Sequence, residues 1–343
     1  MRFRIGFLFF SFWLGYFQVW SQKLRLPEPV TNQSSALLQK DGSGYIYTFF
    51  GLDATKKWSG VHNKVLRLNI GTGESKSVGN VPDVVGRLAS AGSTINNKAY
   101  VVGGYTVFEN GKEKSSRSLF IFNPQTESFT KGPDLPLAID DQVQAVWRDS
   151  LLFVVSGWSD SVNVRSVQVY NPSRNQWNLA TPLPDDKQAA VFGGCGTIVG
   201  DTIYLLGGAM FEKLYPPSRR FYKGRINAQN PLEIHWIQAG EYPGEFRYRS
   251  AAFSLSNKIY FLGGSNETYN YDGISYDGKK PVAPNSTMLI YEMVTGKFTT
   301  SRAPVRVMDL RNILHGGGNV FFVVGGMDEF QKVKEIVETV SVK

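Results

Sequence analysis

The chain has 343 residues, of which 42% are hydrophobic and 13% aromatic, and this composition excludes an intrinsically disordered protein. Its net charge is +8, without the lysine and arginine runs that bind nucleic acid, so no nucleic-acid partner is expected. The single cysteine, Cys195, excludes a disulfide within the chain. The mild positive charge is compatible with an anionic ligand such as an acidic sugar, and equally with a surface charged only for solubility.

The first element in chain order is an N-terminal leader. Met1 to Arg4 is positively charged, the apolar run Ile5 to Trp20 follows, and small residues precede a cut before Gln22. This pattern is typical of a signal peptide, predicted here at residues 1–21. It predicts a periplasmic or secreted protein that does not contact the membrane once the leader is removed. An uncleaved anchor helix is the alternative.

A short apolar strand that ends in a pair of small residues recurs through the rest of the chain. In the clearest copy, Asp201 to Leu206 is followed by Gly207 and Gly208. Such a run is too short for a buried helix, and the small pair allows the backbone to bend sharply. The second small residues of the six copies are 51 to 62 residues apart, at Gly51, Gly104, Gly157, Gly208, Gly264 and Gly326.

The second half of each unit also recurs. A strand, a turn and an aromatic residue follow the variable loop, as in Leu119 to Phe129 and Val167 to Trp177, and then a proline cluster such as Pro133 to Pro136. These units resemble the kelch repeat, whose period is about 50 residues. The resemblance covers nearly all of residues 22–343, and it implies an all-β, six-bladed kelch β-propeller.

The N-terminal strand is expected to close this ring. Leu24 to Pro29 matches the closing strand of a unit, whereas the last copy ends at Val337 to Val342 without one. The first strand is therefore predicted to complete the last blade, which removes exposed sheet edges. The loops after the small pairs and the loops between blades then share one face, where functional residues are expected.

Charged side chains in the loops between blades are the main candidates for a binding site. Arginines there could hold a ligand carboxylate, and aromatic residues after the small pairs could stack on sugar rings. The same side chains could instead brace neighbouring blades. The candidates are Arg87, Asp140, Asp141, Lys187, Arg247, Arg249, Asp309 and Arg311 between blades, and Tyr105 and Trp158 after the small pairs.

No cofactor or metal is expected. The three histidines, His62, His235 and His315, lie in different copies and lack the clustered spacing of metal ligands. The copper enzymes of the galactose oxidase type need a Tyr-His pair, and no tyrosine precedes a histidine here. The glycine run after His315 resembles a lipase oxyanion loop, but the chain has no G-x-S-x-G elbow, so an inner strand is predicted there.

Among kelch proteins, the chain resembles the sialic acid mutarotases, the N-acetylneuraminate epimerase family. Shared features are the leader, the degenerate first copy and the tyrosine-rich loop after Gly264. The resemblance implies interconversion of the anomers of a carboxylated sugar by a general acid and base. The proposed catalytic glutamate of that family falls where this chain has Ala209 and Met210. Glu212 would substitute for it, and Arg219 or Arg220 would correspond to the family's arginine.

Two function hypotheses follow from these patterns. The first is an exported sugar-handling isomerase, with Asp140, Asp141 or Glu212 transferring protons and arginines holding an anionic sugar such as N-acetylneuraminate. The second is a non-catalytic binding or scaffold propeller whose aromatic loops grip a glycan or a protein partner. The residues alone leave open whether the protein is an enzyme.

Overall fold

The computed structural model describes residues 23–83 and 85–342. The signal peptide predicted at residues 1–21 lies outside the described residues. Within them, the regular structure is β-sheet, apart from the single-turn 3₁₀ helix η1 (Trp58–Gly60). The described part of the chain has no helix of the length and apolarity needed to cross a bilayer.

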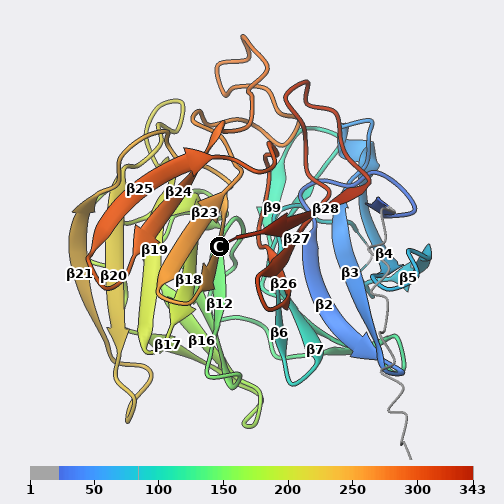
Figure 1. Cartoon of the computed structure of the whole chain (residues 1–343), viewed down its shortest axis with the longest axis horizontal. Helices are drawn as coiled ribbons and strands as arrows, with labels where there is room; N and C mark the ends of the chain where they lie inside the picture. The colour runs from blue at the N-terminus through green and yellow to red at the C-terminus, as the bar shows by residue number, and fades with distance from the viewer. Residues whose placement is uncertain (1–22, 84, 343) are drawn as a thin grey trace, which may run out of the picture.

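Six four-stranded antiparallel sheets form the blades of a propeller, which confirms the predicted fold (Figure 1). Blade 1 consists of β2 (Ser34–Lys40), β3 (Ser43–Leu52), β4 (Val61–Asn69) and β5 (Ser75–Asn80). Blade 2 consists of β6 (Ala91–Ile95), β7 (Lys98–Val102), β10 (Leu119–Asn123) and β11 (Ser128–Lys131). Blade 3 consists of β12 (Val143–Trp147), β13 (Leu151–Val155), β16 (Val167–Asn171) and β17 (Gln176–Ala180).

The remaining blades have the same order. Blade 4 consists of β18 (Val191–Val199), β19 (Thr202–Met210), β20 (Arg220–Ile226) and β21 (Ile234–Glu241). Blade 5 consists of β22 (Ala251–Leu255), β23 (Lys258–Leu262), β24 (Thr287–Glu292) and β25 (Lys297–Arg302). Blade 6 consists of β26 (Leu314–Gly317), β27 (Val320–Val324), β28 (Ile336–Ser341) and β1 (Leu24–Arg25). The first strand of each blade lies innermost, where neighbouring ones such as β6 and β12 contact each other.

The N-terminal strand completes the last blade, as predicted. Leu24 pairs with Val337 and Arg25 with Ile336, both from β28. The next residue, Leu26, is buried, and its amide donates to the carbonyl of Glu335 at 2.7 Å. The ring is therefore closed by joining the first and last described strands of the chain.

The blades bury both faces of their middle strands, which explains the continuous apolar runs in the sequence. In β13, Leu152 and Val154 pack with Tyr100 of blade 2. Phe153 and Val155 lie on the other face of β13 and belong to a cluster that includes Leu205 of blade 4. A strand covered on both sides cannot alternate apolar and polar residues.

The small-residue pairs allow each blade to approach the next one closely. Gly103 and Gly104, after β7, have φ angles of +64° and +87°, a region that glycine adopts without strain. A Cβ on Gly103 would lie 2.3 Å from the carbonyl oxygen of Ile139, in the loop that leads to blade 3. The pair thus fixes the chain after the second strand against the following inter-blade loop.

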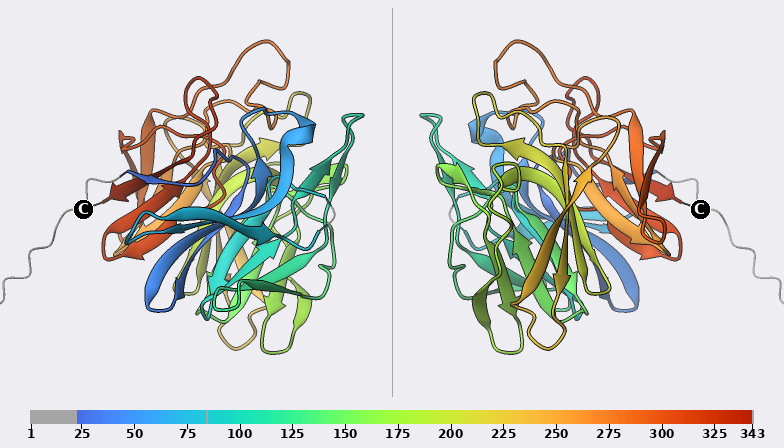
Figure 2. Two further views of the ribbon diagram at one scale, coloured as in Figure 1. Left: turned by 90° about the vertical axis from the view of Figure 1, so that its right-hand side faces the viewer. Right: turned by 90° about the vertical axis from the view of Figure 1, so that its left-hand side faces the viewer.

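The loops that follow the second strands lie together on one face of the propeller. In blades 2 and 3 these loops form short ribbons, β8 (Tyr105–Val107) with β9 (Glu113–Ser115) and β14 (Trp158–Ser159) with β15 (Val162–Asn163). The loop between β23 and β24, coloured orange, extends furthest beyond this face (Figure 2). The candidate site lies beneath these loops.

Candidate functional site

The six inter-blade loops meet around the propeller axis in a hydrogen-bonded ring of left-handed residues. Their φ angles lie between 49° and 70°, at Asn32, Ala89, Asp141, Gly193, Arg249 and Asp309. The amides of four ring residues, Ala89, Asp141, Gly193 and Arg249, each donate to the carbonyl of the preceding ring residue, as from Asp141 to Ala89 at 3.1 Å and from Gly193 to Asp141 at 2.8 Å. In the last inter-blade loop the donor is the amide of Leu310, which follows Asp309 and lies 2.9 Å from the carbonyl of Arg249. These bonds hold alanine and arginine in a conformation that costs L-residues about 1–2 kcal/mol.

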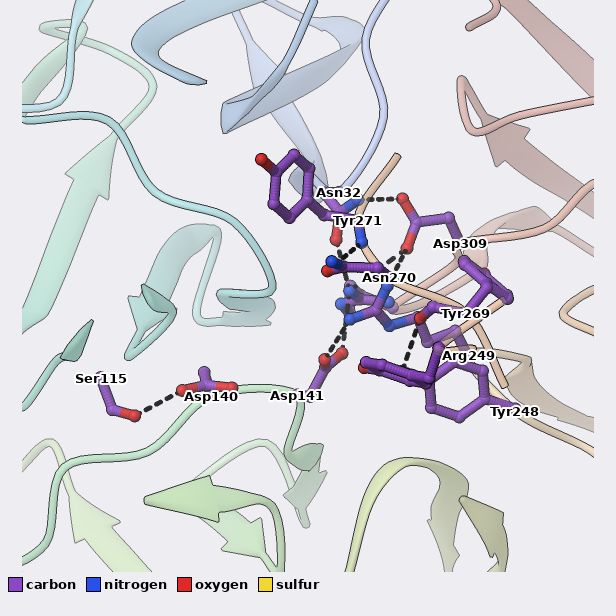
Figure 3. A network of polar contacts seen from close by, with 12 residues as sticks. Asn32, Ser115, Asp140, Asp141, Tyr248, Arg249, Tyr269, Asn270, Tyr271 and Asp309 are labelled. Carbon is purple, nitrogen blue, oxygen red and sulfur yellow. Dashed lines mark hydrogen bonds and ion pairs between the residues drawn. The ribbon is translucent and has the colours of Figure 1, made fainter. Parts of the chain in front are cut away.

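Four charged side chains form a central ion cluster, defined here as Asp141, Arg249, Asp309 and Arg311. Figure 3 shows the first three of them, which are ring residues. Arg249 Nη2 lies 2.7 Å from Asp141 Oδ2, and Arg249 Nη1 lies 3.6 Å from Asp309 Oδ1. Arg311 Nη2 lies 2.8 Å from Asp141 Oδ1 and 3.3 Å from Asp309 Oδ1. The side chains are 0–3% exposed, so water screens these contacts little.

The central ion cluster balances its own charge, with two carboxylates and two guanidinium groups. Asp309 also accepts hydrogen bonds from Thr31, at 2.6 Å, and from Asn32. Burial alone would lower the pKa of Arg249, but the carboxylates beside it, led by Asp141, raise that pKa well above its usual range. Both arginines therefore remain cations that are already neutralised inside the protein.

A cavity of about 200 Å³ opens beside this cluster, beneath the loops of blades 2 to 5. Its volume is below the 300–1,000 Å³ typical of drug-sized ligands, which suits a smaller molecule. The lining residues are Tyr105, Glu113, Asp140, Asp141, Trp158, Phe192, Tyr215, Arg249, Asn270 and Tyr276.

Two carboxyl groups of the cavity form no ion pair with any residue that the structure describes. Asp140 is 3% exposed, and its Oδ2 accepts a hydrogen bond from Ser115 Oγ at 2.5 Å. Burial, reinforced by the charge of Asp141, raises the pKa of Asp140 well above its usual value. Glu113 lies at the exposed mouth of the cavity, where loss of water around its carboxyl also raises its pKa, against the pull of Arg249.

Four aromatic rings form a wall of the cavity. Trp158 contacts Phe192 edge to face, with ring centroids 5.6 Å apart, and Tyr215 at 5.8 Å. Tyr215 lies 4.7 Å from Tyr276. The hydroxyl of Tyr276 is in turn 3.2 Å from that of Tyr248, whose ring lies under the guanidinium of Arg249 at 5.1 Å. The aromatic wall therefore joins the cavity to the central ion cluster.

Two of the predicted binding arginines brace the blades instead of lining the cavity. Arg87 forms an ion pair with Asp83, donates to the Gly103 carbonyl at 3.1 Å and lies over the ring of Phe50. Arg247 is fully buried and donates to the carbonyl and the hydroxyl of Thr287 at 2.7 and 2.9 Å. Both arginines therefore brace neighbouring segments, which is the alternative role that the sequence left open.

Four other predicted residues also lie away from the cavity lining. Arg219 lies 3.9 Å over the ring of Phe246, and Arg220 pairs with Glu241 at 3.3 Å. Lys187 and Glu212 are exposed. The position that matches the family's glutamate, Ala209, is fully buried, and its carbonyl accepts a hydrogen bond from Asn163.

The structure brings together five of the predicted residues at the cavity: Tyr105, Asp140, Asp141, Trp158 and Arg249. Asp309 and Arg311 contact them from within the central ion cluster. The sequence prediction omitted Glu113, Phe192, Tyr215, Asn270 and Tyr276. Phe192 had a signal, because it precedes Gly193 as Asp140 precedes Asp141. The other four residues belong to loops, and the spacing of residues in the sequence does not determine where such loops place their side chains.

The described residues contain no group of three or more His, Cys, Asp or Glu side chains that could hold a metal ion. The lone thiol, Cys195, is buried and unbonded to another cysteine, and burial raises its pKa to about 12.

Comparison with known proteins agrees with this architecture. The Kelch motif matches residues 86–136 and 148–184. The solved structure of YjhT superposes with a TM-score of 0.73 at 15% identity, covering 93% of this chain and 97% of that one. The chain is therefore a six-bladed β-propeller that contains kelch motifs.

Sequence relatives are distant. Kelch-like protein 25 of Xenopus tropicalis is 24% identical over 71% of this chain and 37% of its own length. Kelch-like protein 35 of Mus musculus is 25% identical over 53% of this chain and 28% of its own length. The N-acetylneuraminate epimerase of Pasteurella multocida is 27% identical over 43% of this chain and 36% of its own length. The chain thus spans under two fifths of these relatives, and it is a kelch propeller that resembles the N-acetylneuraminate epimerase family.

Proposed function

We propose that the protein binds a small sugar in the cavity and interconverts its anomers. The observation that carries this proposal is that two carboxyl groups without an ion pair, Asp140 and Glu113, lie beside an aromatic wall. Aromatic faces suit the C–H surfaces of sugars, and carboxyl groups hold and transfer hydroxyl protons. Similarity to the Pasteurella epimerase supports a sugar ligand, and N-acetylneuraminate is the anionic sugar that the likeness suggests.

The chemistry needs one acid and one base near the anomeric carbon. The base removes the proton of the anomeric hydroxyl while the bond from the anomeric carbon to the ring oxygen breaks. The electron pair of that bond passes to the ring oxygen, which takes a proton from the acid. Rotation of the open-chain carbonyl and reversal of these steps gives the other anomer. A raised pKa keeps a proton on Asp140 at a pH where an ordinary aspartate has lost it, so Asp140 is assigned as the acid.

The test is exchange of anomers measured by NMR, with N-acetylneuraminate and a panel of neutral sugars. We expect the protein to accelerate exchange, and Asp140→Asn to reduce the acceleration about 100-fold or more, the usual contribution of a general acid or base. Glu109→Gln is the matched control, because Glu109 is an exposed carboxylate in the same loop as Glu113. Unchanged exchange rates with every sugar would exclude this activity.

The second candidate function is non-catalytic binding, and exposed apolar side chains around the cavity favour it. Phe108, Phe211 and Phe330 lie in loops of this face and are 43%, 53% and 80% exposed. Kelch domains generally bind protein partners, and such side chains suit that role. Glycan binding that leaves anomer exchange unaccelerated, and that Asp140→Asn does not alter, would favour this function.

Export is a further part of the proposal. The leader pattern at residues 1–21 supports a periplasmic or secreted protein. N-terminal sequencing of the protein purified from its native host should begin at Gln22, and a start at Met1 would contradict export by cleavage.

A further inference from the structure

The geometry points to a ligand with a positively charged group, for which the cavity supplies carboxylates and aromatic rings but no free cation. Given the proposed function, the ligand class is a sugar with a free ammonium group, in place of the anionic N-acetylneuraminate that the family likeness suggests. This inference deepens that proposal and rests on it for the sugar, but the cationic group is argued from the cavity alone.

The charge of the cavity comes first. Its lining contains three carboxyl groups, Glu113, Asp140 and Asp141, and one cation, Arg249. Arg249 Nη2 already lies 2.7 Å from Asp141 Oδ2, and Arg249 Nη1 lies 3.6 Å from Asp309 Oδ1. These two carboxylates neutralise both Arg249 and Arg311. An anionic ligand would add a further negative charge beside this buried cluster, whose charges already balance, and an uncompensated buried charge is costly.

The unused polar atom comes second. Asp140 is only 3% exposed and lines the cavity, yet its Oδ1 has no hydrogen bond or ion pair with any residue that the structure describes. A protonated carboxyl can donate as well as accept, but once Asp140 is ionised this oxygen accepts hydrogen bonds only, so the complement of the ionised form is a donor. An ammonium group supplies both the donor and the opposite charge.

The aromatic wall is independent of the carboxyl groups. Trp158 lines the cavity with Phe192, Tyr215 and Tyr276. Aromatic faces attract cations, tryptophan most strongly, and aromatic cages with nearby carboxylates bind amines and quaternary ammonium groups. Carboxyl and aromatic groups together therefore select a cation over an anion of the same shape.

The direction of the pKa of Asp140 gives a second readout. Glu113, Asp141 and Arg249 act electrostatically on Asp140, and Ser115 donates a hydrogen bond to it. A bound cation favours the ionised carboxyl, so binding releases protons and strengthens as the pH rises through the raised pKa. Calorimetry with choline in two buffers of different ionisation enthalpy measures this release, because the charge of choline does not depend on pH.

The deciding experiment is calorimetric titration with three pyranoses that differ mainly in charge, glucosamine, glucose and glucuronate, and with choline as a cation that is no sugar. We expect glucosamine to bind about tenfold more tightly than glucose, and glucuronate more weakly than glucose. Asp140→Asn should abolish the preference, because asparagine keeps an acceptor for Ser115 but loses the charge. Glu109→Gln should keep it.

The outcomes distinguish failure of this inference from failure of the proposed function. Equal affinities for the three sugars, or tightest binding of glucuronate, would overturn the cationic ligand and leave sugar binding intact. Binding of choline without binding of any sugar would retain the cationic ligand and remove the sugar. A protein that binds none of the four compounds would contradict both.

Discussion

Two adjacent aspartates of one inter-blade loop have opposite electrostatic surroundings. Asp141 occupies the left-handed ring position, and its carboxylate lies between Arg249 and Arg311. Asp140, one residue earlier, pairs through its backbone with Trp158, and its carboxyl lines the cavity with Ser115 as its hydrogen-bond partner. The comparison teaches that the ring position, rather than residue type, decides whether a charge holds the blades together or remains free for a ligand.

The other blades support this distinction. The residues equivalent to Asp140, those that precede the left-handed positions, are Thr31, Leu88, Phe192, Tyr248 and Met308. None of these five carries a carboxyl group. The buried carboxyl at this position is thus particular to blade 3, whereas charged or amide side chains at the ring position recur in four blades.

Loss of the ring charge should have the largest effect. Asp141→Asn preserves a residue type that tolerates left-handed φ, but it leaves Arg249 and Arg311 with one carboxylate between them. Breaking a buried ion pair in this way should lower the free energy of unfolding by about 3–5 kcal/mol. Urea denaturation measures this loss, and a change below the error of that measurement would contradict the role of the cluster.

Displacement of Asp140 without loss of its charge should have an intermediate effect. A Cβ on Gly157, whose φ is +124°, would lie 2.6 Å from the Asp140 carbonyl oxygen. Gly157→Ala should therefore destabilise the fold by about 1–3 kcal/mol and shift Asp140 relative to the cavity. Thermal denaturation together with ligand titration tests both parts. A variant that binds and melts like the parent would show that this contact relaxes freely.

Removal of the cavity charge should have a smaller effect of the opposite sign. The folded pKa of Asp140 is raised above its ordinary 3.8, so the folded state holds this proton more tightly than the unfolded chain. Ionised Asp140 therefore destabilises the fold as the pH rises above that ordinary value, and it has no such effect below it. Asp140→Asn should raise the unfolding free energy at neutral pH by on the order of 1 kcal/mol. Denaturation curves against pH should converge with those of the parent protein in acid; a difference that persists there would contradict this origin.

The smallest effect is expected at the glutamate that the family resemblance selected. Glu212 is exposed in the turn after β19 and is absent from the cavity lining. Glu212→Gln should leave both anomer exchange and stability within error of the parent, as surface substitutions usually do. A large loss of activity would move the catalytic site from Asp140 to the blade 4 loop.

The fold could be predicted from the sequence because local chemistry and the repeat agree. The small pair after each apolar run, as at Gly103 and Gly104, is required by the backbone contact with the next loop, and it recurs with the blade. Closure by Leu24 and Arg25 could be predicted because the last repeat lacks its closing strand, whereas an extra closing strand precedes the first repeat. These features depend on backbone geometry, which a repeated pattern records directly.

The site was only partly predictable, because direction within a loop is set by single dihedral angles. Arg247 and Arg249 are two residues apart, yet one braces β24 and the other enters the central ion cluster. Glu113 and Tyr276 reach the cavity from long loops, and no local spacing determines where such loops end. Charge in the right loop was therefore a sound guide to the region and a poor one to the individual residue.

The ring of left-handed residues at the propeller axis separates the backbone that joins the blades from the side chains that set the charge there. Its backbone bonds join carbonyls and amides only, so these bonds do not depend on which side chain a ring position carries. Ala89 and Gly193 are the two ring positions without a functional group in the side chain, and the aromatic ring of Tyr248 leaves no room for a larger residue at Gly193. A charged residue introduced at Ala89 would therefore change the charge at the propeller axis without altering the strands of any blade.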